Sequence, residues 1–156
     1  MYSGLSAVAT ADWRRFAAEA EDRIWVSTDD PHIVDVLGGM MSLLRERASA
    51  KVDVRLLLAV EHQMPTPRRV AIRRPEGPFT GPRVVIFGGV MLVLYDQADS
   101  AASPVLRLQR IRGGGMFAAF TDAFRLAWAD AVPVRTPRKT ARTRTAATEV
   151  VTARVR

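Results

Sequence analysis

A nearly continuous apolar run over residues 52–60 (VDVRLLLAV) constrains the fold more than any other segment of the chain. Strands that are buried on both faces of a mainly parallel sheet have this pattern, because helices cover both of their faces. A shorter β-rich stretch, residues 24–27, comes before it. Between the two, the sequence TDDP at residues 28–31 predicts a helix start, with an aspartate cap and proline at the first helical position. We expect that helix to continue to about residue 49, so residues 24–60 predict a βαβ unit with a right-handed crossover.

The remaining periodicity predicts one helix at each end of the ordered chain and several strands between them. Apolar positions from Ala11 recur at helical spacing, and Asp12 could cap that helix. Residues 69–73 alternate apolar and basic side chains, which suits a strand near an edge. Gly88-Gly89 predicts a hairpin between strands 83–87 and 90–95, and a last strand follows at 105–111. A final helix opens after Gly113-Gly114-Gly115, so we expect a single α/β domain with a mixed sheet, a β-meander and a C-terminal helix.

Length and charge indicate one domain with a basic tail. The 156 residues suit a single domain, and we expect a disordered leader at 1–10, a folded domain at 11–132 and a disordered tail at 133–156. Residues 1–130 carry 16 basic and 15 acidic side chains, whereas residues 131–156 carry 7 basic side chains and only Glu149 as an acid. The excess positive charge therefore lies in the tail. The chain has no cysteine, and its longest apolar run is too short to span a membrane, so we expect a cytoplasmic protein.

Four segments, in this order, resemble the phospholipase D-like sensor domain of TrmB-type and some actinobacterial LuxR-type transcriptional regulators. They are RIWVS at 23–27, VDVRLLL at 52–58, RVVIFGG at 83–89 and FTDAFRLAW at 120–128, and the similarity covers roughly residues 11–132. The resemblance implies a sensor that regulates transcription. Because those regulators carry a helix-turn-helix domain before the sensor, the resemblance also implies a stand-alone sensor with a helix-turn-helix protein as partner. We expect the module to be a homodimer.

The phosphodiesterase motif of the active enzymes of that superfamily, HxKxxxxD, is degenerate here. Its spacing falls on Gly81, Arg83 and Gly88, and glycine can neither attack phosphorus nor orient a base. Neither His32 nor His62 is followed by x-K. We therefore expect a protein that is not an enzyme and has no cofactor.

Three groups of side chains are candidates for binding a ligand, and each has a structural alternative. Asp29, Asp30 and His32 follow the first strand, where they could hold a metal or ligand, although capping the next helix explains the aspartates better. His62 follows the second strand, where ligands bind in open α/β sheets, or it is a half-exposed loop histidine. Five arginines could bind an acidic partner or guard sheet edges: Arg68, Arg69, Arg73, Arg74 and Arg83.

The basic tail is the last candidate. It could contact nucleic-acid phosphates nonspecifically, or it is an ordinary solvated tail; the residues concerned are Arg135, Arg138, Lys139, Arg142 and Arg144. The sequence thus predicts a non-catalytic module, linked to transcription, that senses a small molecule or binds a regulatory protein. The alternative is an accessory nucleic-acid-binding protein that acts through its tail.

Overall fold

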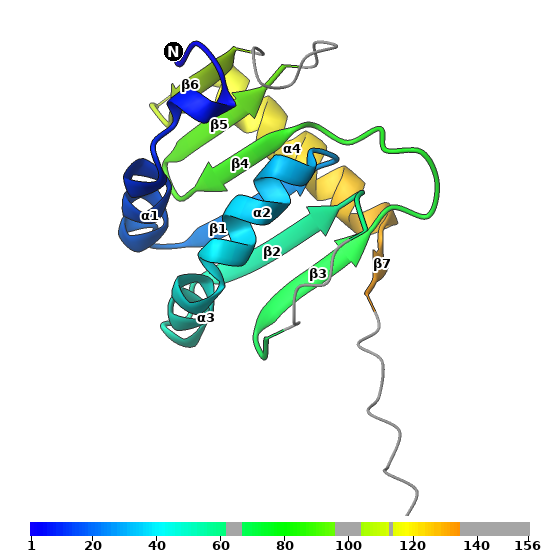
Figure 1. Ribbon diagram of the computed structural model, residues 1–156. Coiled ribbons are helices and arrows are strands. Elements are labelled where there is room, and N and C mark those ends of the chain that lie inside the picture. The colour runs from blue at the N-terminus through cyan, green and yellow to red at the C-terminus, as the bar shows by residue number, and fades with distance from the viewer. Residues whose placement is uncertain (62–66, 96–103, 113, 135–156) are drawn as a thin grey trace, which may run out of the picture.

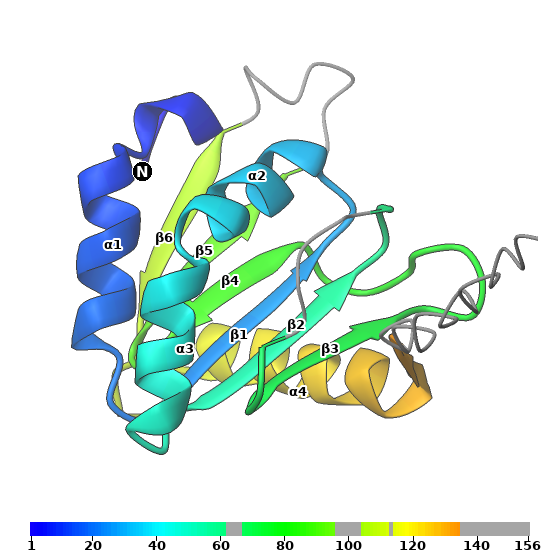
Figure 2. The ribbon, with the colours of Figure 1, turned by 60° about the horizontal axis from the view of Figure 1, so that its bottom comes forward.

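A seven-stranded mixed sheet lies between two layers of helices in the computed structural model. The structure describes residues 1–61, 67–95, 104–112 and 114–134. The strand order is β6-β5-β4-β1-β2-β3-β7. Figure 2 shows α1, α2 and α3 on one face of this sheet and α4 on the other. The predicted α/β class is confirmed, and no helix within the described ranges is long and apolar enough to cross a membrane.

The elements follow one another along the chain as Figure 1 shows. Their bounds are η1 (a 3₁₀ turn, Leu5–Ala7), α1 (Thr10–Glu19), β1 (Arg23–Thr28), α2 (Pro31–Gly39), α3 (Met41–Ser49), β2 (Asp53–Leu58), β3 (Val70–Arg74), β4 (Val84–Phe87), β5 (Val90–Leu94), β6 (Val105–Gln109), α4 (Gly115–Asp130) and β7 (Val132–Pro133).

The predicted βαβ unit is present, but its helical part is broken in two. β1 and β2 are parallel, with Ile24 opposite Val54. The helical segment starts as expected, since Asp30 caps it and Pro31 takes the first helical position. The single helix expected to residue 49 instead divides at Met40, whose φ of −110° and ψ of 5° lie outside the α-helical range. Gly38 and Gly39, which lower helix propensity, end α2 just before this break.

The later strands divide between the two sides of the β1–β2 pair. β3 is parallel to β2, with Leu56 opposite Ile72, and only the two-residue strand β7 lies outside it. The meander consists of β4, β5 and β6, all antiparallel. Gly88 and Gly89 form the β4–β5 turn as predicted, and the φ of +54° at Gly88 explains the need for glycine there.

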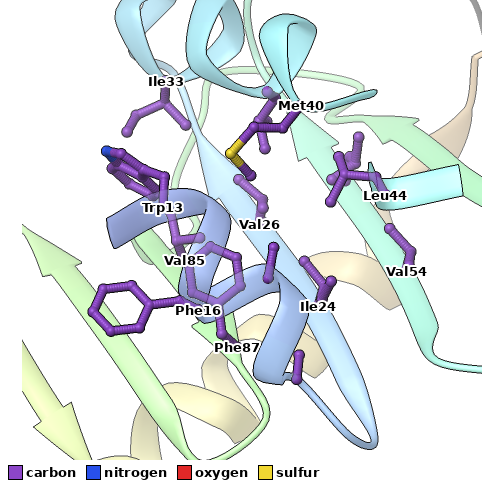
Figure 3. Close-up of a cluster of buried hydrophobic side chains, with 14 of the residues drawn as sticks. Trp13, Phe16, Ile24, Val26, Ile33, Met40, Leu44, Val54, Val85 and Phe87 are labelled. Carbon is purple, nitrogen blue, oxygen red and sulfur yellow. The ribbon is translucent and has the colours of Figure 1, made fainter. Parts of the chain in front are cut away.

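The larger core fills the space between the sheet and helices α1, α2 and α3 (Figure 3). Trp13 is 2% exposed, and its ring meets that of Phe87 edge to face, with 6.1 Å between centroids. Ile33, Leu37 and Leu44, from α2 and α3, are fully buried against the sheet.

A smaller aromatic core fixes α4 to the opposite face. Phe124 stacks between Trp25, at 4.9 Å, and Trp128, at 5.9 Å between ring centroids. The Arg73 guanidinium donates a hydrogen bond of 2.7 Å to the carbonyl oxygen of Trp128. As a result, α4 crosses the sheet from the end of β6 to the end of β3, and β7 then pairs with β3.

Two boundary predictions need correction. Residues 1–10, expected to be a disordered leader, contain η1, and Tyr2 pairs with Val105 beside the edge strand β6. Leu5 and Val8 are 4% and 5% exposed, so their burial in the larger core orders this segment. Residues 133 and 134, expected to begin the tail, also belong to the domain, because β7 pairs with β3 and Val134 donates a backbone hydrogen bond to Ile72. The rest of the predicted tail lies outside the described residues.

Candidate functional site

The three parallel strands β1, β2 and β3 end side by side (Figure 2). A hollow of about 910 Å³ opens beyond these ends. Ligands of open α/β sheets bind beyond the carboxyl ends of such strands. Asp29 follows β1, residues 59–61 follow β2, and Arg74 closes β3. The segment after β3 supplies the remaining wall, which consists of Pro75, Gly77, Pro78 and Phe79, with Val134 beside it.

A two-point polar contact joins Asp29 to Arg83 beside the hollow. Arg83 Nε lies 2.5 Å from Asp29 Oδ1, and Nη2 lies 2.6 Å from Oδ2, so the two planar groups meet at two points. The sheet register brings them together, since β4 runs antiparallel to β1 and Val84 lies opposite Ser27. The hydrogen bond from Arg83 and its positive charge hold the pKa of the Asp29 carboxyl below its usual value, although burial opposes this shift.

Asp30 and His32 have a local, structural arrangement. The Asp30 carboxylate accepts a hydrogen bond of 2.8 Å from the backbone N–H of His32, and Thr28 Oγ1 accepts one of 3.0 Å from the N–H of Asp30. The two aspartates therefore point to different partners, and His32 is exposed on the first turn of α2. Over the described ranges, no group of three or more His, Asp or Glu side chains could hold a metal ion.

The structure does not bring the five predicted arginines together. β3 runs parallel to β2 and β1, so its last residues lie with the carboxyl ends of those strands, whereas the residues before its start lie at the other end of the sheet. Arg68 and Arg69 precede β3, and the Arg69 guanidinium contacts the carbonyl oxygen of Ser49 at 3.4 Å. Arg73 is bound to α4. Of the five, Arg74 and Arg83 lie beside the hollow at the carboxyl ends of the parallel strands, so the expected cluster of five arginines is wrong as a single site.

Several predicted residues cannot be placed. His62 lies outside the described residues, as do Arg135, Arg138, Lys139, Arg142 and Arg144. Glu61, the neighbour of His62, is exposed and lines the hollow.

Phe79 is the residue that sequence reasoning missed. Its ring lies 6.0 Å from the Arg83 guanidinium and lines the hollow. A signal was available, because Phe79 is the aromatic residue of the proline- and glycine-rich segment 75–82. In the structure Phe79 is half-buried and also packs against the smaller core.

The glycines at the degenerate motif positions serve packing and turn geometry. A Cβ atom on Gly81 would lie 3.0 Å from the Phe79 ring and 3.2 Å from both Ser27 Oγ and Ala127 Cβ, so the backbone approaches β1 and α4 closely. Gly88 lies at the other end of β4, in the hairpin turn. Within this alignment, Arg83 is thus the one motif position that carries a functional group, and that group binds Asp29.

Comparison with known proteins identifies the fold. No family model matches the chain, and no curated protein matches it in sequence. Among solved structures, the chain is similar to TrmBL2, an archaeal chromatin protein reported to show a novel mode of DNA binding. The TM-score is 0.61 with 13% sequence identity. The fold is TrmB-like.

This similarity has a defined extent. It covers 81% of this chain and 51% of the TrmBL2 chain, so the chain spans about half the length of that protein. At 13% identity the comparison concerns the fold and not the activity.

Proposed function

We propose that the chain is a non-catalytic, phospholipase D-like sensor module that binds a small hydroxylated molecule at the carboxyl ends of β1, β2 and β3. The observation that carries the proposal is the hollow of about 910 Å³ beside the Asp29–Arg83 ion pair. The TrmB-like fold supports a link to transcription. We propose that a helix-turn-helix unit supplies the DNA contact, and that the module acts in the cytoplasm as a homodimer.

The wall chemistry suits a sugar or a phosphosugar. Asp29 and Glu61 provide carboxylate acceptors for hydroxyl groups, and Arg74 provides donors for a phosphate or hydroxyl. Phe79 offers a flat apolar surface against which a ring can pack. Arg83 fixes the orientation of the Asp29 carboxylate before any ligand arrives, so less ordering is needed on binding.

A thermal-shift screen of sugars, phosphosugars and nucleotides tests this proposal. We expect at least one sugar or phosphosugar to raise the melting temperature of the wild-type protein in a concentration-dependent way. The same compound should have a much smaller effect on Phe79→Ala and Asp29→Asn. Asp35→Asn is the matched control, because Asp35 is exposed on α2 and does not line the hollow. A panel with no active compound, or equal shifts in all four proteins, contradicts the proposal.

The charge of the C-terminal segment favours a second candidate, an accessory nucleic-acid-binding protein. Residues 131–156 carry 7 basic side chains against one acid, and TrmBL2 is described as a DNA-binding chromatin protein. Deleting residues 135–156 should then abolish a DNA mobility shift that weakens as salt rises. Unchanged binding after deletion, or none by either protein at low salt, contradicts this candidate.

A further inference from the structure

A second hollow, of about 460 Å³, lies on the α4 face of the sheet. It is next to the amino end of β1, whereas the candidate site is at the carboxyl ends of β1, β2 and β3. Its walls come from the start of β1, the segment after β6 and the first three turns of α4. Three of its lining residues are arginines: Arg23, Arg110 and Arg125. Neither the ion pair Asp29–Arg83 nor Phe79 touches it, so it is a separate site.

The sheet topology brings the three arginines together from distant parts of the chain. Arg23 is the first residue of β1. Arg110 follows β6, and its backbone N–H donates a hydrogen bond to the carbonyl oxygen of Gly89 in the β4–β5 turn. This bond holds Arg110 at the end of the sheet where β1 starts. Both guanidiniums contact one carboxylate oxygen of Asp22, at 2.9 Å from Arg23 and 3.5 Å from Arg110. Arg125, on α4, contacts Asp122 at 2.9 Å.

Positive charge is in excess at this hollow. Three guanidiniums face two carboxylates, those of Asp22 and Asp122, and each guanidinium has five N–H donors. The side chains of Arg110 and Arg125 are 54% and 55% exposed, so a ligand in the hollow can reach both. The 16-residue helix α4 adds the positive end of its dipole, since its first turn carries no acidic residue and no side-chain cap.

Two large apolar side chains line the hollow beside the arginines. Phe117 is 7% exposed and Ile111 is 69% exposed. The exposed isoleucine can contact the apolar part of a ligand while the exposed arginines bind its charged group. From this combination we propose that the hollow binds a small amphiphilic anion, a phosphate monoester or carboxylate attached to an apolar group.

Titration of ¹⁵N-labelled full-length protein with phenyl phosphate tests the proposal by NMR. The amide signals of Gly114 and Gly115, which line the hollow, should shift in a saturable way, with smaller shifts for inorganic phosphate and none for the neutral analogue benzyl alcohol. Absence of any shift at millimolar ligand overturns the proposal. An equal response to benzyl alcohol overturns it as well, because the arginines would then have no role.

Charge-removing variants locate the anion. Arg110→Gln and Arg125→Gln should each weaken phenyl phosphate binding by about fivefold to tenfold, because each removes charge-assisted hydrogen bonds. Both side chains are largely exposed, so the remaining amide signals should show an intact fold. Arg45→Gln, an exposed arginine on α3 at the other face of the sheet, is the matched control and should bind as the wild type does. Wild-type affinity in both test variants overturns the proposal.

Discussion

Arg83 and Asp29, which are 54 residues apart in the sequence, meet in a two-point ion pair at the end of β1. Each side chain is about 30% exposed, so water weakens the pair only in part. Asp29→Asn should therefore lower the free energy of unfolding at pH 7 by about 1.5 kcal/mol, the scale of hydrogen bonds to charged groups. Urea denaturation of wild type and variant measures this difference.

The same pair predicts a pH dependence. The pKa of Asp29 is lower in the folded protein than its ordinary value of 3.8, so the unfolded chain binds the proton first as the pH falls. The contribution of the pair is complete above pH 3.8 and is lost as the pH falls through the folded-state pKa. The stability difference between wild type and Asp29→Asn should thus be constant from pH 7 to pH 5 and shrink toward zero in stronger acid. A difference that stays the same throughout would show that the ion pair contributes nothing.

Two neighbouring hydroxyls of β1 should respond in opposite ways to removal. Ser27 Oγ is buried and has no hydrogen-bond partner in the described part of the structure, so Ser27→Ala should leave stability unchanged or raise it by up to about 1 kcal/mol. Thr28 Oγ1 accepts a hydrogen bond from Asp30, so Thr28→Val should cost about 1 kcal/mol. Thermal and urea unfolding measure both. A clear loss in Ser27→Ala would mean that Ser27 has a polar partner.

The hairpin turn between β4 and β5 offers a matched pair of glycines. Gly88 has a φ of +54°, and a Cβ atom there would lie 3.3 Å from Asp22 Oδ1, so Gly88→Ala should cost about 1–2 kcal/mol. Gly89 has no positive φ, and a Cβ atom there would lie 3.9 Å from Arg110 Cβ, an ordinary van der Waals distance, so Gly89→Ala should change stability by less than about 0.5 kcal/mol. If urea denaturation gave the same loss in the free energy of unfolding for both substitutions, the positive φ at Gly88 would be contradicted.

The ordered N-terminal segment can be tested in the same way. Leu5 is buried in the larger core, so Leu5→Ala should lower the free energy of unfolding by about 2 kcal/mol. Ser6 is exposed, and Ser6→Ala should change it by less than about 0.5 kcal/mol. If Leu5→Ala were as stable as the wild type, the segment would be a disordered leader after all.

Local sequence patterns predicted most of the elements but not the contacts between distant ones. The structure confirms three predictions that depend on only a few neighbouring residues. They are the strand in the apolar run at 52–60, the helix start at Asp30-Pro31 and the turn at Gly88-Gly89. The break at Met40 was missed because the apolar face continues through it: Leu37, Met40 and Leu44 are all buried. Helical periodicity alone cannot distinguish one bent segment from two helices.

The candidate site was predicted only in part, because it depends on strand order and direction. Asp29 follows β1 in the sequence, so its edge of the sheet could be inferred. The grouping of Arg68 and Arg69 with Arg83 failed because Arg68 and Arg69 precede β3, at the amino ends of the parallel strands. Arg83 precedes the antiparallel strand β4 and so lies at their carboxyl ends. Pairing of Arg83 with Asp29 requires β4 to lie antiparallel beside β1, and nothing near either residue in the sequence indicates that pairing.

The most direct test of the central claim is an NMR titration of full-length protein with the strongest sugar or phosphosugar from the thermal-shift screen. We predict that the amide signals of Asp29, Ala59 and Phe79 shift together and saturate, and that Phe79→Ala loses most of this response. Signals that shift only elsewhere, or a response of the same affinity in Phe79→Ala, would contradict ligand binding at the carboxyl ends of β1, β2 and β3.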